Sequence, residues 1–255
     1  MRRFFDPQPL QQDQSCVLGE LASHHIGKVL RMRVGDSLVL FNGTGGEWVS
    51  EITVIDKRRV TIMPRRFSAD NRSAPLQVQL MLPMLKGERM DYALQKATEL
   101  GVSTIQLLLC ERGEVRLSAE RLEKRMQHWQ QVLISACEQC GLNLLPALHP
   151  PRPLIELLAQ PSVPQPAAAP ETTTLRLIAH PGAAPLTGAL LSNRQAICLL
   201  TGPEGGFSEA EIDAAEQAGY QAFALGERVL RAETAPLALL AALWTAHSLN
   251  QSIST

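Results

Sequence analysis

The chain has 255 residues, enough for two domains and for a hydrophobic core that needs no disulfides. Hydrophobic residues make up 45% of it and charged residues 19%, a globular composition that excludes an intrinsically disordered chain. The net charge of −1 conceals an asymmetry, because residues 1–72 hold 11 Lys and Arg against 8 Asp and Glu. The N-terminal segment is therefore the better candidate for a surface that faces a polyanion.

Short β-strands separated by tight turns are predicted over residues 1–72. Val34–Ile55 alternates strand-forming residues with glycine turns such as Asn42-Gly43, whose positive φ suits hairpins. Val60–Met63 adds a further strand, and Ser23–Arg31 has the pattern of a short helical turn. These elements predict a small β-barrel domain.

From Leu76 onward, after a polar stretch at 68–75 that predicts a linker, strands alternate with helices. The predicted strands are 76–82, 102–109, 175–179, 196–201 and 220–225, and the predicted helices are 87–100, 118–139, 208–217 and 236–249. This alternation predicts a parallel α/β sheet that binds its ligand beyond the carboxyl ends of the strands. A Pro- and Ala-rich stretch at about 159–174 predicts a surface insertion.

The sequence shows neither a targeting signal nor a cysteine pattern that indicates a specific function. The apolar run 235–247 is too short to cross a bilayer, and the first residues lack the apolar stretch of a signal peptide, so we expect a cytoplasmic protein. Five cysteines without regular spacing argue against a disulfide scaffold. Cys137 and Cys140 form a Cys-x-x-Cys pair near a predicted helix end, without a second ligand pair, and we interpret them as structural and expect no metal site.

The loop that follows the strand 196–201 is rich in glycine. Gly202–Gly206 contains three glycines, which let the backbone approach a ligand closely. Ser208 and Glu211 fit a capping box for the next helix. The loop lacks the residues of the common phosphate-binding motifs, and taken alone it also fits a simple strand-to-helix turn.

A second loop, Leu225–Thr234, enters an almost wholly apolar helix. It carries Arg228, Arg231 and Glu233, charges that are costly there unless they have partners or a ligand. Glu233 also suits the helix N-terminus as a cap. Because His180-Pro-Gly182 follows a third predicted strand, we expect all three segments at one edge of the sheet.

Four motifs in chain order resemble the RsmE family. They are Gln95–Gly101, Ala136–Gln139, Gly202–Gly206 and the Leu225–Ala235 segment, and the similarity extends to Arg2-Arg-Phe-Phe and His25–Arg31. The family consists of S-adenosylmethionine-dependent enzymes that methylate N3 of a uridine in 16S ribosomal RNA. The resemblance implies an N-terminal PUA-like β-barrel (residues 1–72) and a C-terminal α/β SPOUT methyltransferase domain (residues 73–255). It further implies that the parallel sheet is trefoil-knotted and that the protein is a homodimer.

The resemblance also implies where the cofactor and the RNA would bind. S-adenosylmethionine would lie between the two loops, and the implied contacts are Leu200, Thr201, Gly202, Glu204, Gly205, Leu225, Gly226, Val229, Leu230 and Ala232. The apolar helix 236–249 would be buried in the dimer interface. The cations expected to meet RNA phosphates are Arg2, Arg3, His25, Lys28, Arg31, Lys86 and Arg89. The sequence departs from the family pattern at Leu142, where an Arg is usual.

The catalytic residues follow from the chemistry of the acceptor. Uridine N3–H is a weak acid with a pKa of about 10, so N3 becomes nucleophilic only when the proton leaves. Arg231, and after it Arg228, would stabilise the resulting anion. Glu233 or Glu204 would accept the proton or hold the arginine in place, and the sequence does not separate these roles.

Other functions remain open at this stage. One alternative is a knotted methyltransferase that acts on another RNA, and a second is a non-catalytic ribosome-assembly factor that binds RNA. A Rossmann-type dehydrogenase is disfavoured, because no glycine fingerprint follows the strand 76–82.

Overall fold

The computed structural model describes residues 1–74, 76–160, 174–185 and 196–253, and it divides into two compact units. The first unit comprises Met1–Ser73 and Ile134–Leu145, and the second comprises Ala74–Leu133 and Pro146–Thr255. The helix α3 (Ala119–Cys140) contributes residues to both. The predicted insertion lies outside the described residues from 161 to 173.

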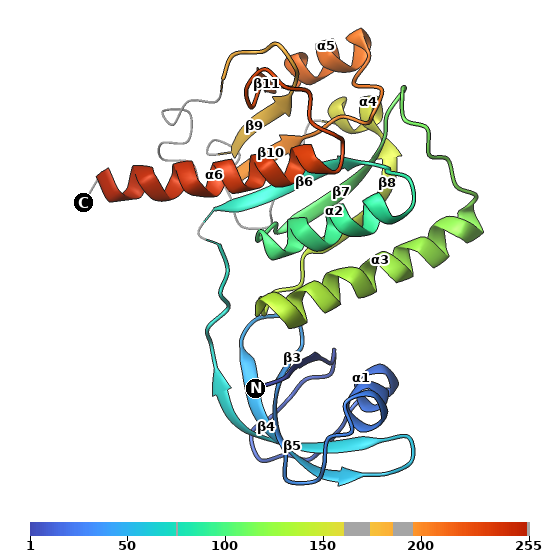
Figure 1. Ribbon diagram of the computed structural model, residues 1–255, viewed down its shortest axis with the longest axis vertical. Coiled ribbons are helices and arrows are strands. Elements are labelled where there is room, and N and C mark those ends of the chain that lie inside the picture. Colours follow the sequence, from blue (N-terminus) through green and yellow to red (C-terminus); the bar gives the residue numbers. More distant parts are fainter. Residues whose placement is uncertain (75, 161–173, 186–195, 254–255) are drawn as a thin grey trace. The chain divides into compact units, whose positions relative to one another are not determined.

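The first unit is built on a five-stranded sheet in the order β1-β3-β4-β5-β2 (Figure 1). Its strands are β1 (Arg3–Phe5), β2 (Cys16–Val17), β3 (Ser37–Phe41), β4 (Glu47–Ile55) and β5 (Val60–Ser68). β1 pairs in parallel with β3, and the other pairs are antiparallel. The predicted helical turn forms α1 (Glu20–His24) and the π-helical turn η1 (His25–Val29).

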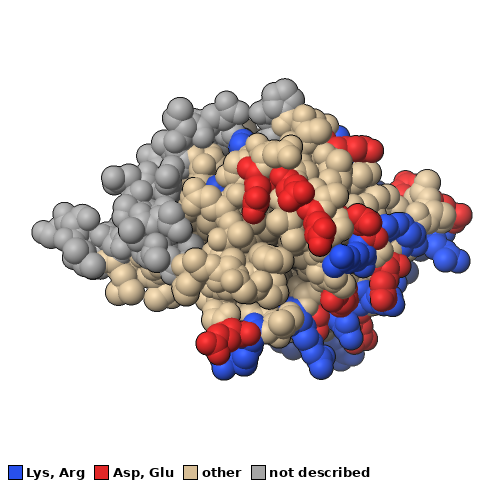
Figure 2. Space-filling model, turned by 90° about the horizontal axis from the view of Figure 1, so that it is seen from above, with Lys and Arg blue, Asp and Glu red and all other residues tan. Residues whose placement is uncertain are grey.

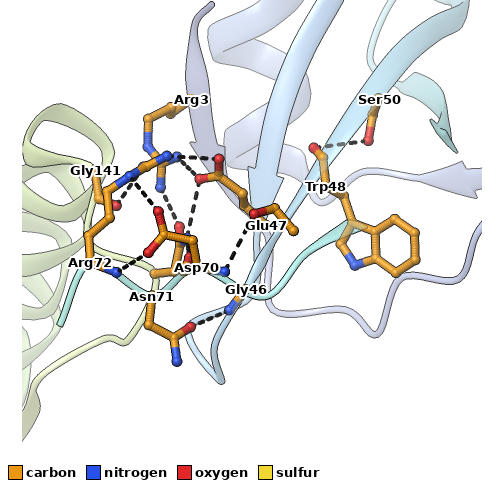
Figure 3. A network of polar contacts seen from close by, with 11 residues as sticks. Arg3, Gly46, Glu47, Trp48, Ser50, Asp70, Asn71, Arg72 and Gly141 are labelled. Carbon is orange, nitrogen blue, oxygen red and sulfur yellow. Dashed lines mark hydrogen bonds and ion pairs between the residues drawn. The ribbon is translucent and has the colours of Figure 1, made fainter. Parts of the chain in front are cut away.

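A buried carboxylate ties distant segments of this unit together (Figure 3). The Glu47 side chain forms an ion pair with Arg3 and accepts hydrogen bonds from Arg72 Nη2 at 2.9 Å and Asn143 Nδ2 at 3.2 Å. Burial alone would raise the pKa of Glu47, but the hydrogen bonds from Arg3, Asn143 and Arg72 hold it below its ordinary value. The side chain of Arg72 therefore anchors the predicted linker to the first unit.

The second unit contains a six-stranded, fully parallel sheet in the order β11-β9-β10-β6-β7-β8. Its strands are β6 (Gln77–Pro83), β7 (Thr104–Leu109), β8 (Ala147–Pro153), β9 (Thr174–Ala179), β10 (Ala196–Leu200) and β11 (Gln221–Phe223). The parallel sheet predicted from the strand–helix alternation is confirmed. The sequence did not predict β8, which carries three prolines and tolerates them because it is an edge strand.

Helices cover the sheet of the second unit. They are α2 (Glu88–Glu99), the N-terminal part of α3, α4 (Leu154–Leu158), α5 (Glu209–Gln217) and α6 (Thr234–Ile253). α2 and α6 lie side by side across the strands in Figure 1, and Trp244 of α6 donates a hydrogen bond to the carbonyl of Leu100. α4 and α5 pack with Met81, Ile178 and Leu200 in a separate buried cluster. No described helix is long and apolar enough to cross a membrane.

Candidate active site

Because the strands are parallel, their carboxyl ends lie along one edge of the sheet, and a cavity of about 520 Å³ opens there. Segments that follow β9, β10 and β11 line it, as the sequence predicted, and they include His180, Gly202 and Gly226. Segments after β6 and β7 contribute Arg89 and Arg112, which the sequence did not place there. The volume falls in the range of small-molecule sites.

The loop after β10 is shaped by its own packing. A Cβ at Gly205 would stand 3.0 Å from the Cβ and 3.1 Å from the carbonyl oxygen of Arg112. The glycine therefore lets the backbone approach Arg112 of the protein closely, rather than a ligand. Gly206 has φ +69° and open space where a Cβ would lie, and it lines the cavity. The predicted capping box is confirmed, because Ser208 accepts from Glu211 N–H and Glu211 accepts from Ser208 N–H.

The loop before α6 supplies a large part of the cavity wall. Gly226 has φ +76° and open space at its Cβ position, and Val229 is 78% exposed. Arg228, Arg231 and Glu233, the predicted catalytic residues, all line the cavity. Thr234 begins α6, two residues earlier than the sequence predicted.

An arginine from α2 bridges the two loops. Arg89 Nη1 donates to Glu204 Oε1 at 3.2 Å, and Arg89 Nε lies 3.8 Å from Glu233 Oε1. The Glu233 side chain is 12% exposed, and its Oε2 is buried without any hydrogen-bond donor. Among the described residues, the wall thus combines Arg89, Arg112, Arg228 and Arg231 with two glutamates.

Most predicted cofactor contacts line the cavity, and three do not. Those in its wall are Gly202, Glu204, Leu225, Gly226, Val229, Leu230 and Ala232. Leu200 and Thr201 are fully buried, where Thr201 Oγ1 donates to the carbonyl of Met81, and Gly205 stands against Arg112. Phe207 and His180 also line the cavity. The signal for each in the sequence was its position shortly after a predicted strand.

The seven predicted RNA-binding residues fall into two groups. Arg3, Lys86 and Arg89 are paired with the carboxylates of Glu47, Glu114 and Glu204, and the Arg3 side chain is only 11% exposed. Arg2, His25, Lys28 and Arg31 are exposed, and the described part of the structure gives them no ion pair. Lys86 and Arg89 are nevertheless 61% and 48% exposed, so Arg3 is the one predicted cation whose side chain is largely withdrawn from solvent.

Sequence reasoning overlooked a basic hairpin in the first unit. Lys57, Arg58 and Arg59 are exposed in the turn between β4 and β5, which a hydrogen bond from Asp56 N–H to the Arg59 carbonyl closes. A Cβ on Gly27 would lie 3.7 Å from Val60 and 3.9 Å from Ile55, so η1 with Lys28 packs against this end of the hairpin. Three consecutive cations in a turn were the available signal.

The described part of the face seen in Figure 2 lacks a continuous run of cations like that of the basic hairpin Lys57–Arg59. In Figure 2, acidic and basic side chains lie next to one another toward the right and along the lower edge, and the described surface between them and the grey atoms is mostly uncharged. A phosphate backbone favours a continuous basic field, so this face does not have the character of an RNA-binding surface.

Leu142 and Cys137 are buried in the first unit, whereas Cys140 is exposed. Leu142 is 8% exposed and packs with Phe41 and Cys137. Burial raises the pKa of the Cys137 thiol to about 12, which disfavours the thiolate that redox or metal chemistry needs. Among the described residues, no group of three His, Cys, Asp or Glu could hold a metal ion.

Comparisons with known proteins first define the class. The RNA methyltransferase domain family matches residues 72–244, and the RNA methyltransferase PUA domain family matches residues 22–63. A β-rich N-terminal sheet joined to a fully parallel sheet with a cavity at its carboxyl edge is thus the architecture of an RNA methyltransferase with a PUA domain.

Individual relatives define the family. The ribosomal RNA small subunit methyltransferase E of Buchnera aphidicola subsp. Schizaphis graminum is 34% identical over 92% of both chains. The crystal structure of ribosomal RNA small subunit methyltransferase E from Neisseria gonorrhoeae, bound to S-adenosyl methionine, is 36% identical with a TM-score of 0.85, covering 96% of this chain and 97% of that one. A Legionella pneumophila methyltransferase in complex with SAM is 35% identical with a TM-score of 0.83, covering 96% and 97%.

The chain belongs to the ribosomal RNA small subunit methyltransferase E family, the S-adenosylmethionine-dependent family that its sequence motifs resemble. The expected fold class is confirmed with it.

Proposed function

We propose that the protein transfers a methyl group from S-adenosylmethionine to N3 of a specific uridine in 16S ribosomal RNA. The observation that carries the proposal is the cavity at the carboxyl edge of the parallel sheet, whose wall combines Arg228, Arg231 and Glu233. The names of the relatives support ribosomal RNA of the small subunit as the substrate.

The residues of the cavity fit the cofactor. Open space at the Cβ positions of Gly206 and Gly226 admits a ligand close to the backbone, and Leu225 and Leu230 offer apolar contacts to an adenine ring. When bound, the cofactor supplies an electrophilic methyl group whose bond to sulfur breaks with its electron pair remaining on sulfur.

The protein's own residues would prepare the acceptor. Arg231, and after it Arg228, donate hydrogen bonds to the anion that forms over O2, N3 and O4 of the uracil. Glu233 or Glu204 takes the N3 proton. The cavity wall would hold and orient the acceptor base, and this positioning would supply much of the rate.

RNA would reach the cavity through contacts with the exposed cations of the first unit. Arg2, His25, Lys28 and Arg31, together with the hairpin residues Lys57–Arg59, are free to meet phosphates. Such contacts position the RNA without reading its sequence. The proposed division of labour gives the PUA-like domain the RNA and gives the SPOUT domain the chemistry.

We also propose a homodimer that acts in the cytoplasm, where ribosomal RNA is the substrate. Exposed apolar side chains support the dimer, because Leu225, Val229 and Leu249 are 39%, 78% and 60% exposed on the cavity loop and on α6. A partner subunit that buries them also shields the cavity. Sedimentation of the purified protein at micromolar concentration tests this, and a monomer would contradict it.

Methyl transfer in vitro tests the proposed function. The purified protein is incubated with methyl-labelled S-adenosylmethionine and with small subunits from a strain that lacks the gene, and the RNA is digested to nucleosides. We expect the label in N3-methyluridine. Label in a ribose methyl group would support a knotted methyltransferase of other specificity, and RNA binding without transfer would support an assembly factor.

A further inference from the structure

Arg89 lines the cavity wall, and its side chain is 48% exposed. It belongs to the first turn of α2, and it contacts one carboxylate from each of the two cavity loops, Glu204 after β10 and Glu233 before α6. Lys28 and Arg31 differ from Arg89 in that they have no ion pair in the part of the chain that the structure describes. A cation already shared by two carboxylates is poorly suited to release them for a phosphate.

The two carboxylates have different surroundings. Glu204 is 33% exposed and accepts a hydrogen bond from Arg89 at 3.2 Å. Glu233 is 12% exposed, its Oε1 is 3.8 Å from Arg89, and its Oε2 is buried without a donor. Leaving a buried acceptor unsatisfied costs on the order of 1–3 kcal/mol, so such a group calls for a partner or a role. Glu233 therefore keeps a buried acceptor without a donor in a residue that lines the cavity, whereas Glu204 is the more exposed of the two carboxylates.

We propose that Arg89 is a positioning residue for methyl transfer, which holds Glu233 through Oε1 and leaves Oε2 as the proton acceptor for N3–H of the uracil. The inference rests on the proposed function, and it separates the two glutamates that the sequence left equivalent. An N3–H that reaches Oε2 meets an acceptor with neither a protein donor nor exposure to water.

The proton and the electrons balance within this assignment. The N3–H bond breaks, its proton moves to Oε2 of Glu233, and the electron pair remains on the uracil ring. Arg231 lies two residues before Glu233 on the same loop and lines the same cavity. Its guanidinium can therefore stabilise the negative charge that develops on the uracil ring. The pair on N3 is then available to form the new bond to carbon.

A double-mutant cycle tests the proposal. Arg89→Met, Glu233→Gln and the double variant are compared with wild type in single-turnover methyl transfer at saturating cofactor and saturating small subunits. We expect Glu233→Gln to lower the rate at least about 100-fold and Arg89→Met about 10-fold. The double variant should be no slower than Glu233→Gln alone, because Arg89 acts through Glu233. Arg89→Lys, which keeps the charge, should recover part of the rate.

Affinity for RNA supplies the independent readout. Arg89→Met should bind the small subunit with wild-type affinity and with an unchanged salt dependence. Lys124→Met is the matched control, since it removes an exposed cation that is paired with Glu120 on α3, and it should leave both rate and affinity unchanged.

Two results would overturn the proposal. One is a weaker RNA affinity for Arg89→Met, with the slope of log K against log salt reduced by about 0.9 and an unchanged rate at saturation, since that is the behaviour of a phosphate contact. The other is a double variant whose fold decrease in the methyl-transfer rate equals the product of the decreases in the two single variants. Absence of transfer by the wild-type protein would instead contradict the proposed function, so the two failures are distinguishable.

Discussion

Replacement of Glu47 by Gln tests the polar network of the first unit. The substitution keeps the shape of the side chain but removes the anionic partner of Arg3, whose side chain is only 11% exposed and whose Nε already lacks a hydrogen-bond partner. Breaking a buried ion pair from one side costs about 3–5 kcal/mol. We expect about 3 kcal/mol, at the low end, because the second arginine of the network, Arg72, is 41% exposed.

Hydrogen–deuterium exchange of the β3 and β4 amides measures this loss within the unit itself. About 3 kcal/mol corresponds to roughly 150-fold faster exchange for amides that open with the whole unit. Glu51→Gln is the matched control, since its ion pair with Arg65 is exposed on both sides and is worth less than about 1 kcal/mol. If Glu47→Gln costs no more than Glu51→Gln, the network is not a determinant of stability.

The same network predicts a pH dependence. The pKa of Glu47 in the folded protein is held below its ordinary value of 4.5 by the hydrogen bonds from Arg3, Asn143 and Arg72, despite burial. A carboxyl group with a lowered pKa stabilises the fold fully above its unfolded-state pKa and loses this contribution as pH falls through the folded-state pKa. The cost of Glu47→Gln should therefore be constant near neutral pH and shrink below about pH 4.5. A cost that grows on acidification would refute this reasoning.

Three further substitutions address the cavity. Arg231→Ala should lower turnover about 100- to 1,000-fold at saturating cofactor, and near-wild-type turnover would remove its assigned role. Gly226→Ala should weaken cofactor binding in calorimetry, because the methyl group enters the cavity and φ is +76°, whereas Gly35→Ala, with φ +91° and equally open space, should carry only the strain. Ser208→Ala should cost about 1 kcal/mol in urea unfolding through loss of the capping box, and an unchanged midpoint would contradict this.

The sequence was most informative where local patterns determine structure. Strand–helix alternation predicted the parallel sheet, and parallel strands in turn placed His180, Gly202 and Gly226 at one edge, where the cavity lies. The Ser208–Glu211 capping box follows from residues three apart, so it could be predicted without knowledge of the fold.

Long-range pairing could not be predicted in the same way. Arg89 and Glu204 are 115 residues apart, and they meet only because β6 and β10 are neighbours in the sheet. Arg3 has the sequence signature of an exposed N-terminal cation, yet its partner Glu47 lies 44 residues away on β4. The family resemblance led us to expect both arginines to bind RNA, while tertiary packing gives each a carboxylate.

Mapping of the modified nucleosides in cells tests the central claim most directly. Small-subunit ribosomal RNA is compared between the parent strain, a strain that lacks the gene, and the deletion strain complemented with wild type or with Arg231→Ala. We predict that one N3-methyluridine is present in the parent, absent from the deletion strain, restored by the wild-type gene and not restored by the variant. An unchanged N3-methyluridine in the deletion strain, or loss of a different methylated nucleoside, would contradict the proposed function.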